Sequence, residues 1–120
     1  MCANELYKVH HRLGNLNYRK SDFSKAIECY QKALDLFTQD YKVYYDLASA
    51  YYSTKEFELS IINYKEALSL KPNDLYSKNG LAVSYLAIKN FEEARELAEE
   101  IMEVDKRLAK KILDQIENQG

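Results

Sequence analysis

The stretch FSKAIECYQKAL, residues 23–34, is written a second time as FELSIINYKEAL at residues 57–68. The two copies share Phe, Ile, Tyr, Ala and Leu at five positions and are 34 residues apart. A weaker third copy, FEEARELAEEIM, follows after the same interval at residues 91–102. A fixed period of this length is typical of repeat proteins in which each unit is one small supersecondary structure.

The repetition extends upstream of each copy. Leu13, Leu47 and Leu81 are each followed by Gly or Ala, and a short polar turn then leads into the copy. Within the second copy, apolar or small residues recur every three or four positions, which predicts an amphipathic helix. Each unit is therefore predicted to be helix, turn, helix, with helices at residues 3–19, 23–37, 40–54, 57–70, 74–88 and 91–104.

Several residues mark the helix ends. Asp22 and Asn90 are suited to cap the helices that they precede. Pro72 ends the fourth helix, and Asp74 is suited to cap the fifth. Because one such unit cannot bury its apolar face alone, the three are expected to stack into a continuous core. In that core, Phe57 is expected to be a buried ring at the central interface.

Composition limits the classes of function. The formal net charge of −2 provides no basic field for a nucleic-acid partner, and none is expected. No apolar run approaches the roughly 20 residues that span a bilayer, so membrane insertion is not expected either. Cys2 and Cys29 are too few for a disulfide framework and lack metal-ligand spacing. Since the N-terminus lacks a signal-peptide pattern, a cytoplasmic location is expected.

The repeated residues resemble the tetratricopeptide repeat (TPR), with Leu-small-x-x-Tyr, then Ala-x-x-x-aromatic, Ala-Leu and Pro. The second unit matches best, at Tyr44, Leu47, Ala48, Tyr51, Phe57, Tyr64, Ala67, Leu68 and Pro72. Five positions depart from the pattern without disturbing the register: His10, Asn17, Ser60, Lys78 and Ala98. The resemblance implies an all-α fold, a right-handed α-solenoid. It also implies one domain over residues 1–120, with units at about 7–40, 41–74 and 75–108.

The last segment, KRLAKKILDQIENQG, falls outside the three units. Leu108, Ile112 and Ile116 form an apolar stripe at helical spacing, and charged residues occupy the other face. An array with an exposed apolar end requires a terminal cap with a polar outer side. Residues 107–118 are therefore predicted to form a seventh, capping helix. Because no proline separates this segment from the preceding helix near Asp105, one long fused helix is the alternative.

The resemblance further implies that the first helix of each unit lines a concave groove. By register, the groove residues are Lys8, His11, Arg12, Asn15, Tyr18, Arg19, Lys42, Tyr45, Asp46, Ser49, Tyr52, Tyr76, Asn79, Gly80, Val83 and Leu86. Their basic members lie toward the N-terminal end, whereas Val83 and Leu86 make the C-terminal end apolar. The expected partner is therefore a protein or peptide segment that is part acidic and part apolar. The groove tyrosines suit recognition, or they pack between neighbouring helices.

One use of this family is a dicarboxylate clamp that holds the acidic C-terminal tails of heat-shock chaperones. The clamp requires Lys and Asn four residues apart, Asn in the next unit, and then Lys and Arg four apart. The corresponding places here hold His11, Asn15, Asp46, Tyr76 and Gly80, in that order. Only Asn15 matches, and Asp46 would repel a carboxylate, so this use is not expected of the chain.

The Asn79-Gly80 pair lies inside a predicted helix. Gly80 is interpreted there as a tolerated helix glycine, with a hollow beside Tyr45 and Tyr76 as the alternative.

Nothing in the sequence assembles a catalytic site. No Ser/His/Asp order, phosphate loop or pocketed carboxylate pair occurs. His10 and His11 are adjacent, so on a helix they point about 100° apart and cannot share one metal ion. We expect neither enzymatic activity nor a metal or cofactor. The expected function is a non-catalytic adaptor that binds a peptide or partner protein in the groove. The alternative is a scaffold module that forms homo-oligomers through its capping helix or by helix exchange.

Overall fold

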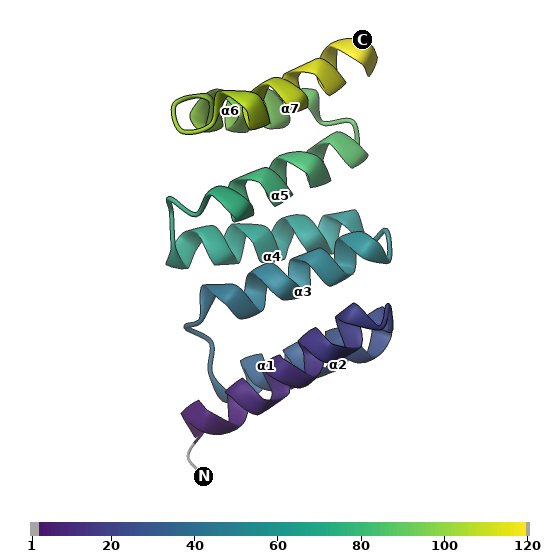
Figure 1. Cartoon of the computed structure of the whole chain (residues 1–120), viewed down its shortest axis with the longest axis vertical. Helices are drawn as coiled ribbons and strands as arrows, with labels where there is room; N and C mark the ends of the chain where they lie inside the picture. Colours follow the sequence, from purple (N-terminus) through teal and green to yellow (C-terminus); the bar gives the residue numbers. More distant parts are fainter. Residues whose placement is uncertain (1–2, 120) are drawn as a thin grey trace.

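The chain folds into a single stack of helices (Figure 1). The computed structural model describes residues 3–119, which form seven α-helices and no strand. Their bounds are α1 Ala3–Arg19, α2 Phe23–Leu36, α3 Tyr41–Ser53, α4 Phe57–Leu70, α5 Leu75–Ala87, α6 Phe91–Met102 and α7 Lys106–Gln119. The stack measures 50 × 26 × 20 Å, with the chain termini at opposite ends. The predicted all-α solenoid of three helix-turn-helix units and a capping helix is confirmed.

The turns inside the three units share one backbone geometry. Ser21, Lys55 and Lys89 lie 34 residues apart and have positive φ angles of 62°, 64° and 62°. After each of them, a backbone N–H bonds back to the carbonyl five residues earlier, as from Asp22 to Asn17 at 2.8 Å. This is the left-handed turn that commonly ends a helix and usually employs glycine. In this chain Ser or Lys occupies the position with positive φ, where glycine is usual. The left-handed turn could therefore not be recognised from a glycine in the sequence.

Capping side chains begin the helices at the predicted positions. The Asp22 side chain accepts from the Lys25 N–H at 3.3 Å, and the Asn90 side chain accepts from the Glu93 N–H at 3.5 Å. The Asp74 carboxylate accepts from both the N–H and the hydroxyl of Ser77, at 3.1 and 2.6 Å. All three predicted caps are confirmed, and each satisfies a backbone donor that has no partner within its helix.

The capping helix is separate from α6. The chain breaks between Met102 and Lys106, and the Asp105 carboxylate caps α7 by accepting from the Leu108 N–H at 3.1 Å. The apolar side of α7 is buried in the C-terminal part of the core, with Ile112 and Ile116 only 2% and 5% exposed. The fused-helix alternative is therefore wrong, because a side-chain cap starts a new helix where the sequence offers no proline.

Two tyrosines in α2 and α4 lie against the glycines of neighbouring helices. A Cβ atom on Gly14 would lie 2.5 Å from the Tyr30 ring, and one on Gly80 would lie 2.4 Å from the Tyr64 ring. Real Cβ contacts are not this short, so each glycine lets a ring approach the helix backbone. Gly80 is a helix glycine, as predicted, but it is more than tolerated, and the hollow beside Tyr45 and Tyr76 does not include it. Gly80 is required by close packing, and the Tyr64 ring fills the space beside it.

Phe57 is not the fully buried ring that the sequence suggested. It is half-buried at the start of α4, where its ring meets Tyr52 edge-on at a centroid distance of 5.2 Å. Phe23 and Tyr18 make the same contact, also at 5.2 Å, in the first unit. These rings cover the turn ends of the units, whereas Tyr30, Val43 and Ile101 are among the largest fully buried side chains.

The two packed tyrosines predict a loss of stability in alkaline solution. Burial raises the pKa of the Tyr30 and Tyr64 hydroxyls above the ordinary value of 10.0. The unfolded chain releases these protons near pH 10, whereas the folded chain retains them to higher pH. Their contribution to the free energy of unfolding is therefore complete below about pH 10 and declines as the pH rises further. Urea unfolding from about pH 9 to pH 11 measures this decline.

The matched control is Tyr30→Phe/Tyr64→Phe, which keeps both rings and removes both ionisable groups. Its stability should fall less steeply with pH than that of the wild type, although burial also raises the pKa of Tyr7, Tyr44 and Tyr45, which both proteins keep. Parallel curves would show that these two hydroxyls do not cause the decline.

Candidate functional site

The first helices of the three units share one face of the stack. α1 contacts α3, and α3 contacts α5. A hollow of about 280 Å³ opens where these helices meet, lined by His11, Asn15, Tyr41, Lys42, Tyr45, Asp46, Asp74 and Tyr76. We call it the central hollow. It brings together side chains from all three units, which is the arrangement that a ligand spanning the repeats requires.

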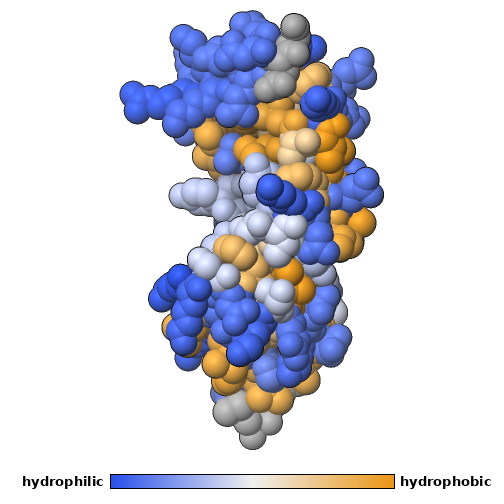
Figure 2. Space-filling model, turned by 90° about the vertical axis from the view of Figure 1, so that its right-hand side faces the viewer, coloured by the Kyte–Doolittle hydropathy of each residue, from blue (hydrophilic) through white to orange (hydrophobic). Residues whose placement is uncertain are grey.

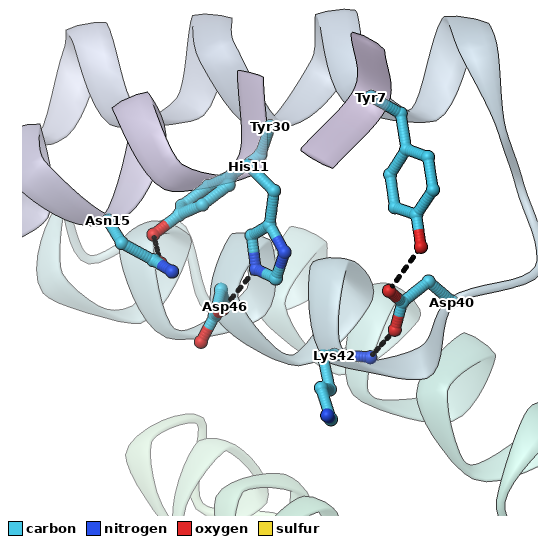
Figure 3. A network of polar contacts seen from close by, with 7 residues as sticks. All are labelled: Tyr7, His11, Asn15, Tyr30, Asp40, Lys42 and Asp46. Carbon is cyan, nitrogen blue, oxygen red and sulfur yellow. Dashed lines mark hydrogen bonds and ion pairs between the residues drawn. The ribbon is translucent and has the colours of Figure 1, made fainter. Parts of the chain in front are cut away.

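A polar pair forms one wall of the central hollow (Figure 3). The Nε2 atom of His11 lies 2.6 Å from Oδ2 of Asp46, and the two side chains are only 15% and 27% exposed. Next to them, the Tyr30 hydroxyl donates to Oδ1 of Asn15 at 2.6 Å. The pair links α1 to α3 and fixes the Asp46 carboxylate in the hollow. The other carboxylate oxygen of Asp46, Oδ1, takes no part in this contact. Because an ionised carboxylate only accepts hydrogen bonds, Oδ1 suits a donor group on a ligand better than an anion.

A second polar link holds the same two helices together near their N-terminal ends. The Tyr7 hydroxyl donates to Oδ2 of Asp40 at 2.8 Å, and Oδ1 of Asp40 accepts from the Lys42 N–H at 3.0 Å. Asp40 therefore caps α3 and anchors α1 at once, as Figure 3 shows. These contacts fix the relative position of α1 and α3 and so the width of the central hollow.

Mostly apolar side chains line a second hollow on the C-terminal part of the same face. It is smaller, at about 210 Å³, and is lined by Tyr52, Val83, Leu86, Ala87 and Gln115. Three of these residues were predicted from the repeat register. Gln115 was not, because it belongs to α7, which lies outside the repeats. We call this the apolar hollow.

The basic residues predicted for the groove lie at different depths. Lys42 lines the central hollow, whereas Lys8, Arg12 and Arg19 are exposed along α1 and do not line it. Arg12 and Arg19 instead line a third depression of about 260 Å³ together with Asn15 and Leu16. The structure thus separates a basic rim on α1 from the hollow beside it.

Several predicted groove residues also join neighbouring helices. Tyr18 and Ser53 share a hydrogen bond of 3.3 Å between α1 and α3, and Ser49 bonds the Tyr64 hydroxyl at 2.9 Å. Asn79 and Gly80 are half-buried in α5, where the Tyr64 ring covers Gly80.

Two residues of the central hollow, Tyr41 and Asp74, were missed by the sequence reasoning. They lie at or just before the start of a helix, one and two residues ahead of the predicted positions Lys42 and Tyr76.

Residues 3–119 contain no helix that is both long and apolar enough to cross a membrane. The same residues hold no group of three or more His, Cys, Asp or Glu side chains placed to bind a metal ion.

Comparisons with known proteins agree on one family. Tetratricopeptide repeat profiles match residues 7–37, 41–74 and 75–110. No curated protein sequence matches the chain.

Similar solved structures include the first TPR of Spaghetti (RPAP3) bound to the HSP90 peptide SRMEEVD. It is 23% identical with a TM-score of 0.88, over 94% of this chain and 91% of that one. The Arabidopsis OM64 TPR domain is 16% identical with a TM-score of 0.91, covering 98% and 99% of the two chains. The TPR2B domain of yeast Sti1 in complex with an Hsp70 peptide is 20% identical with a TM-score of 0.86, covering 95% and 98%. At these identities the likeness shows the fold.

Proposed function

Because this chain belongs to the tetratricopeptide repeat family, we propose that it is a non-catalytic adaptor that binds a segment of a partner protein across α1, α3 and α5. The observation that carries the proposal is the row of hollows on one face, polar in the centre and apolar toward α7. A segment laid along this row would contact all three units. Similar domains from RPAP3 and yeast Sti1 were solved with chaperone peptides, which supports peptide binding as a use of this fold.

The ligand proposed for this groove carries acidic and apolar residues in separate places. Acidic side chains would contact Lys8, Arg12 and Arg19 on the rim, together with Lys42, and apolar side chains would enter the apolar hollow. Because the rim cations are exposed, salt should weaken their contribution, with screening lengths of roughly 8–10 Å near physiological ionic strength. The tyrosines between them add contact area at a low cost in conformational entropy.

The centre of the groove does not suit a terminal carboxylate. At the clamp positions, Asp46 is a carboxylate paired with His11, and Tyr76 carries no charge. The clamp has an arginine at the position of Gly80. A larger residue does not fit there without rearrangement, because the Tyr64 ring occupies the place where its Cβ atom would lie. We therefore propose an internal segment of a partner as the ligand, with a hydrogen-bond donor directed at Asp46.

Self-association through the capping helix has less support. Within the described residues, the exposed large apolar side chains do not include any from α7. The outer side of α7 instead carries charged residues, among them Lys106, Lys110, Lys111, Asp114 and Glu117.

The proposal predicts that Arg12→Glu/Tyr45→Ala loses the partners that the wild type captures from a lysate of the source. Arg12→Glu should mainly slow association, because it reverses a charge on the rim. Tyr45→Ala should mainly speed dissociation, by about tenfold or more, because it removes an aromatic contact from the hollow. Capture followed by mass spectrometry identifies the partner, and surface plasmon resonance then separates the two rates.

Lys110→Glu/Lys111→Glu, on the exposed side of α7, is the matched control for charge reversal. It should retain the wild-type partners. If the groove variant also retains them while its circular dichroism is unchanged, the groove is not the binding site.

A further inference from the structure

An apolar stripe runs along the outer side of α1. Leu6, Val9, Leu13 and Leu16 are 37%, 39%, 43% and 49% exposed. Their spacing of three, four and three residues puts them on one face of the helix. Single exposed leucines are ordinary in proteins, but four in a row on one helix form a continuous apolar surface.

The repeat register shows that this surface is a stacking position without an occupant among the described residues. The residues 34 and 68 positions after Val9, Leu13 and Leu16 are only 0–5% exposed: Val43, Leu47, Ala50, Ser77, Leu81 and Ser84. In those units the second helix of the preceding unit packs against the first helix, as α2 does on α3 and α4 on α5. The outer side of α1 has the same apolar character, and no described helix covers it.

The opposite end of the stack is closed. There α7 packs against α6 with its apolar side and presents charged residues outward. Figure 2 shows hydrophilic side chains over the C-terminal end, at the top, and hydrophobic ones reaching the surface near the N-terminal end. The described residues therefore combine a capped end with an uncapped one.

The charges beside the stripe indicate what kind of helix fits. Arg12 and Arg19 line a depression together with Leu16, and Lys8 and Lys20 are also exposed nearby. Glu5 is the single carboxylate in the described part of α1. A second copy of this face would carry the same excess of cations and could offset them only through Glu5. A helix with carboxylates along its edge would instead neutralise them.

We propose that the outer face of α1 is a second docking site, which differs from the concave groove in its apolar stripe and shares with it only the cations Arg12 and Arg19 along its edge. Its ligand is an amphipathic helix of a partner protein, with small and apolar residues on the contact face and carboxylates along the edge near Arg12 and Arg19. The ligand packs where the second helix of a preceding unit would lie.

The chain itself supplies a probe of this chemistry. The α6 helix is a second helix of a unit, with Ala94, Leu97, Ala98 and Ile101 buried on one face and glutamates exposed on the other. A fluorescent peptide of residues 91–104, blocked at both ends, carries that face and six glutamates. A second peptide in which these glutamates are glutamines serves as the charge control.

Fluorescence anisotropy should show that the acidic peptide binds the wild-type protein. Leu13→Gln/Leu16→Gln should weaken this binding by about tenfold or more, because it makes the contact face polar. Arg12→Gln/Arg19→Gln should weaken it as well and reduce its salt dependence, and the glutamine peptide should bind less well than the acidic one. Tyr45→Ala, in the groove, should leave the binding unchanged.

Leu59→Gln/Ile62→Gln is the matched control, since these side chains of α4 are 40% and 54% exposed. It should bind the peptide as the wild type does. Absence of binding to the wild type, or equal binding by the stripe variant, would overturn the proposal. So would a wild-type dimer in sedimentation analysis that Leu13→Gln/Leu16→Gln dissociates, because a second copy would then be the occupant.

Discussion

Replacing Tyr64 with alanine should lower the free energy of unfolding by about 3–5 kcal/mol. The ring is 5% exposed and lies against the backbone at Gly80, where a Cβ atom would be 2.4 Å away. Its hydroxyl and that of Ser49 share a hydrogen bond of 2.9 Å, and its ring packs edge-to-face with that of Tyr45 at a centroid distance of 5.7 Å. The substitution leaves a cavity between α3, α4 and α5 that these rigid helices cannot close. Urea unfolding followed by circular dichroism measures the change.

Two other ring deletions calibrate that result. Tyr76→Ala removes a ring that is 71% exposed, so the unfolding free energy should change by no more than about 0.5 kcal/mol. Phe57→Ala removes a half-buried ring and should cost about half as much as Tyr64→Ala. Equal costs for Phe57→Ala and Tyr64→Ala would contradict the burial described for the two rings.

Leu47→Ala should lower the free energy of unfolding by about 3 kcal/mol, whereas Leu13→Ala should lower it by about 1 kcal/mol or less. The two leucines occupy the same register position and lose the same atoms. They differ in burial. Leu47 is 3% exposed because the preceding unit packs on it, whereas Leu13 is 43% exposed. The pair therefore measures the contribution of a stacked neighbour, and denaturant unfolding of both variants at one protein concentration gives the difference.

A cost for Leu13→Ala as large as that for Leu47→Ala would mean that the outer face of α1 is covered in solution. Repeating the measurement at a tenfold lower protein concentration would then show whether a second copy supplies the cover, since dimer stability depends on concentration.

The period of 34 residues was sufficient to predict the fold. It assigned the six repeat helices to within about two residues at each end, because turns and caps recur with the same interval. The capping helix followed from the polar outer side that the end of an array requires. The repeat register did not predict that Phe57 is only half-buried. The same residue type recurs at this position in each unit, but that recurrence carries no information on the solvent exposure of the turn where the ring lies.

The groove was less predictable than the fold. Register placed Asn15, Tyr45, Asp46 and Tyr76 around one hollow, because it specifies which helix face a residue occupies. It could not reveal that Asp46 pairs with His11, since this contact joins different units and depends on side chains that the other units lack. It also gave no sign of Gln115, which reaches the apolar hollow from a helix outside the repeat.

The capping helix also determines whether the molecule can grow into a polymer. Without α7, the buried face of α6, including Ile101, would be open at one end while the stripe on α1 stayed open at the other. Subunits with two complementary open ends join head to tail, and each addition creates a new end, so such growth leads to filaments. With α7 in place, its apolar side covers this face of α6 and charged residues face outward. The capping helix would thus oppose head-to-tail growth from that end of the stack.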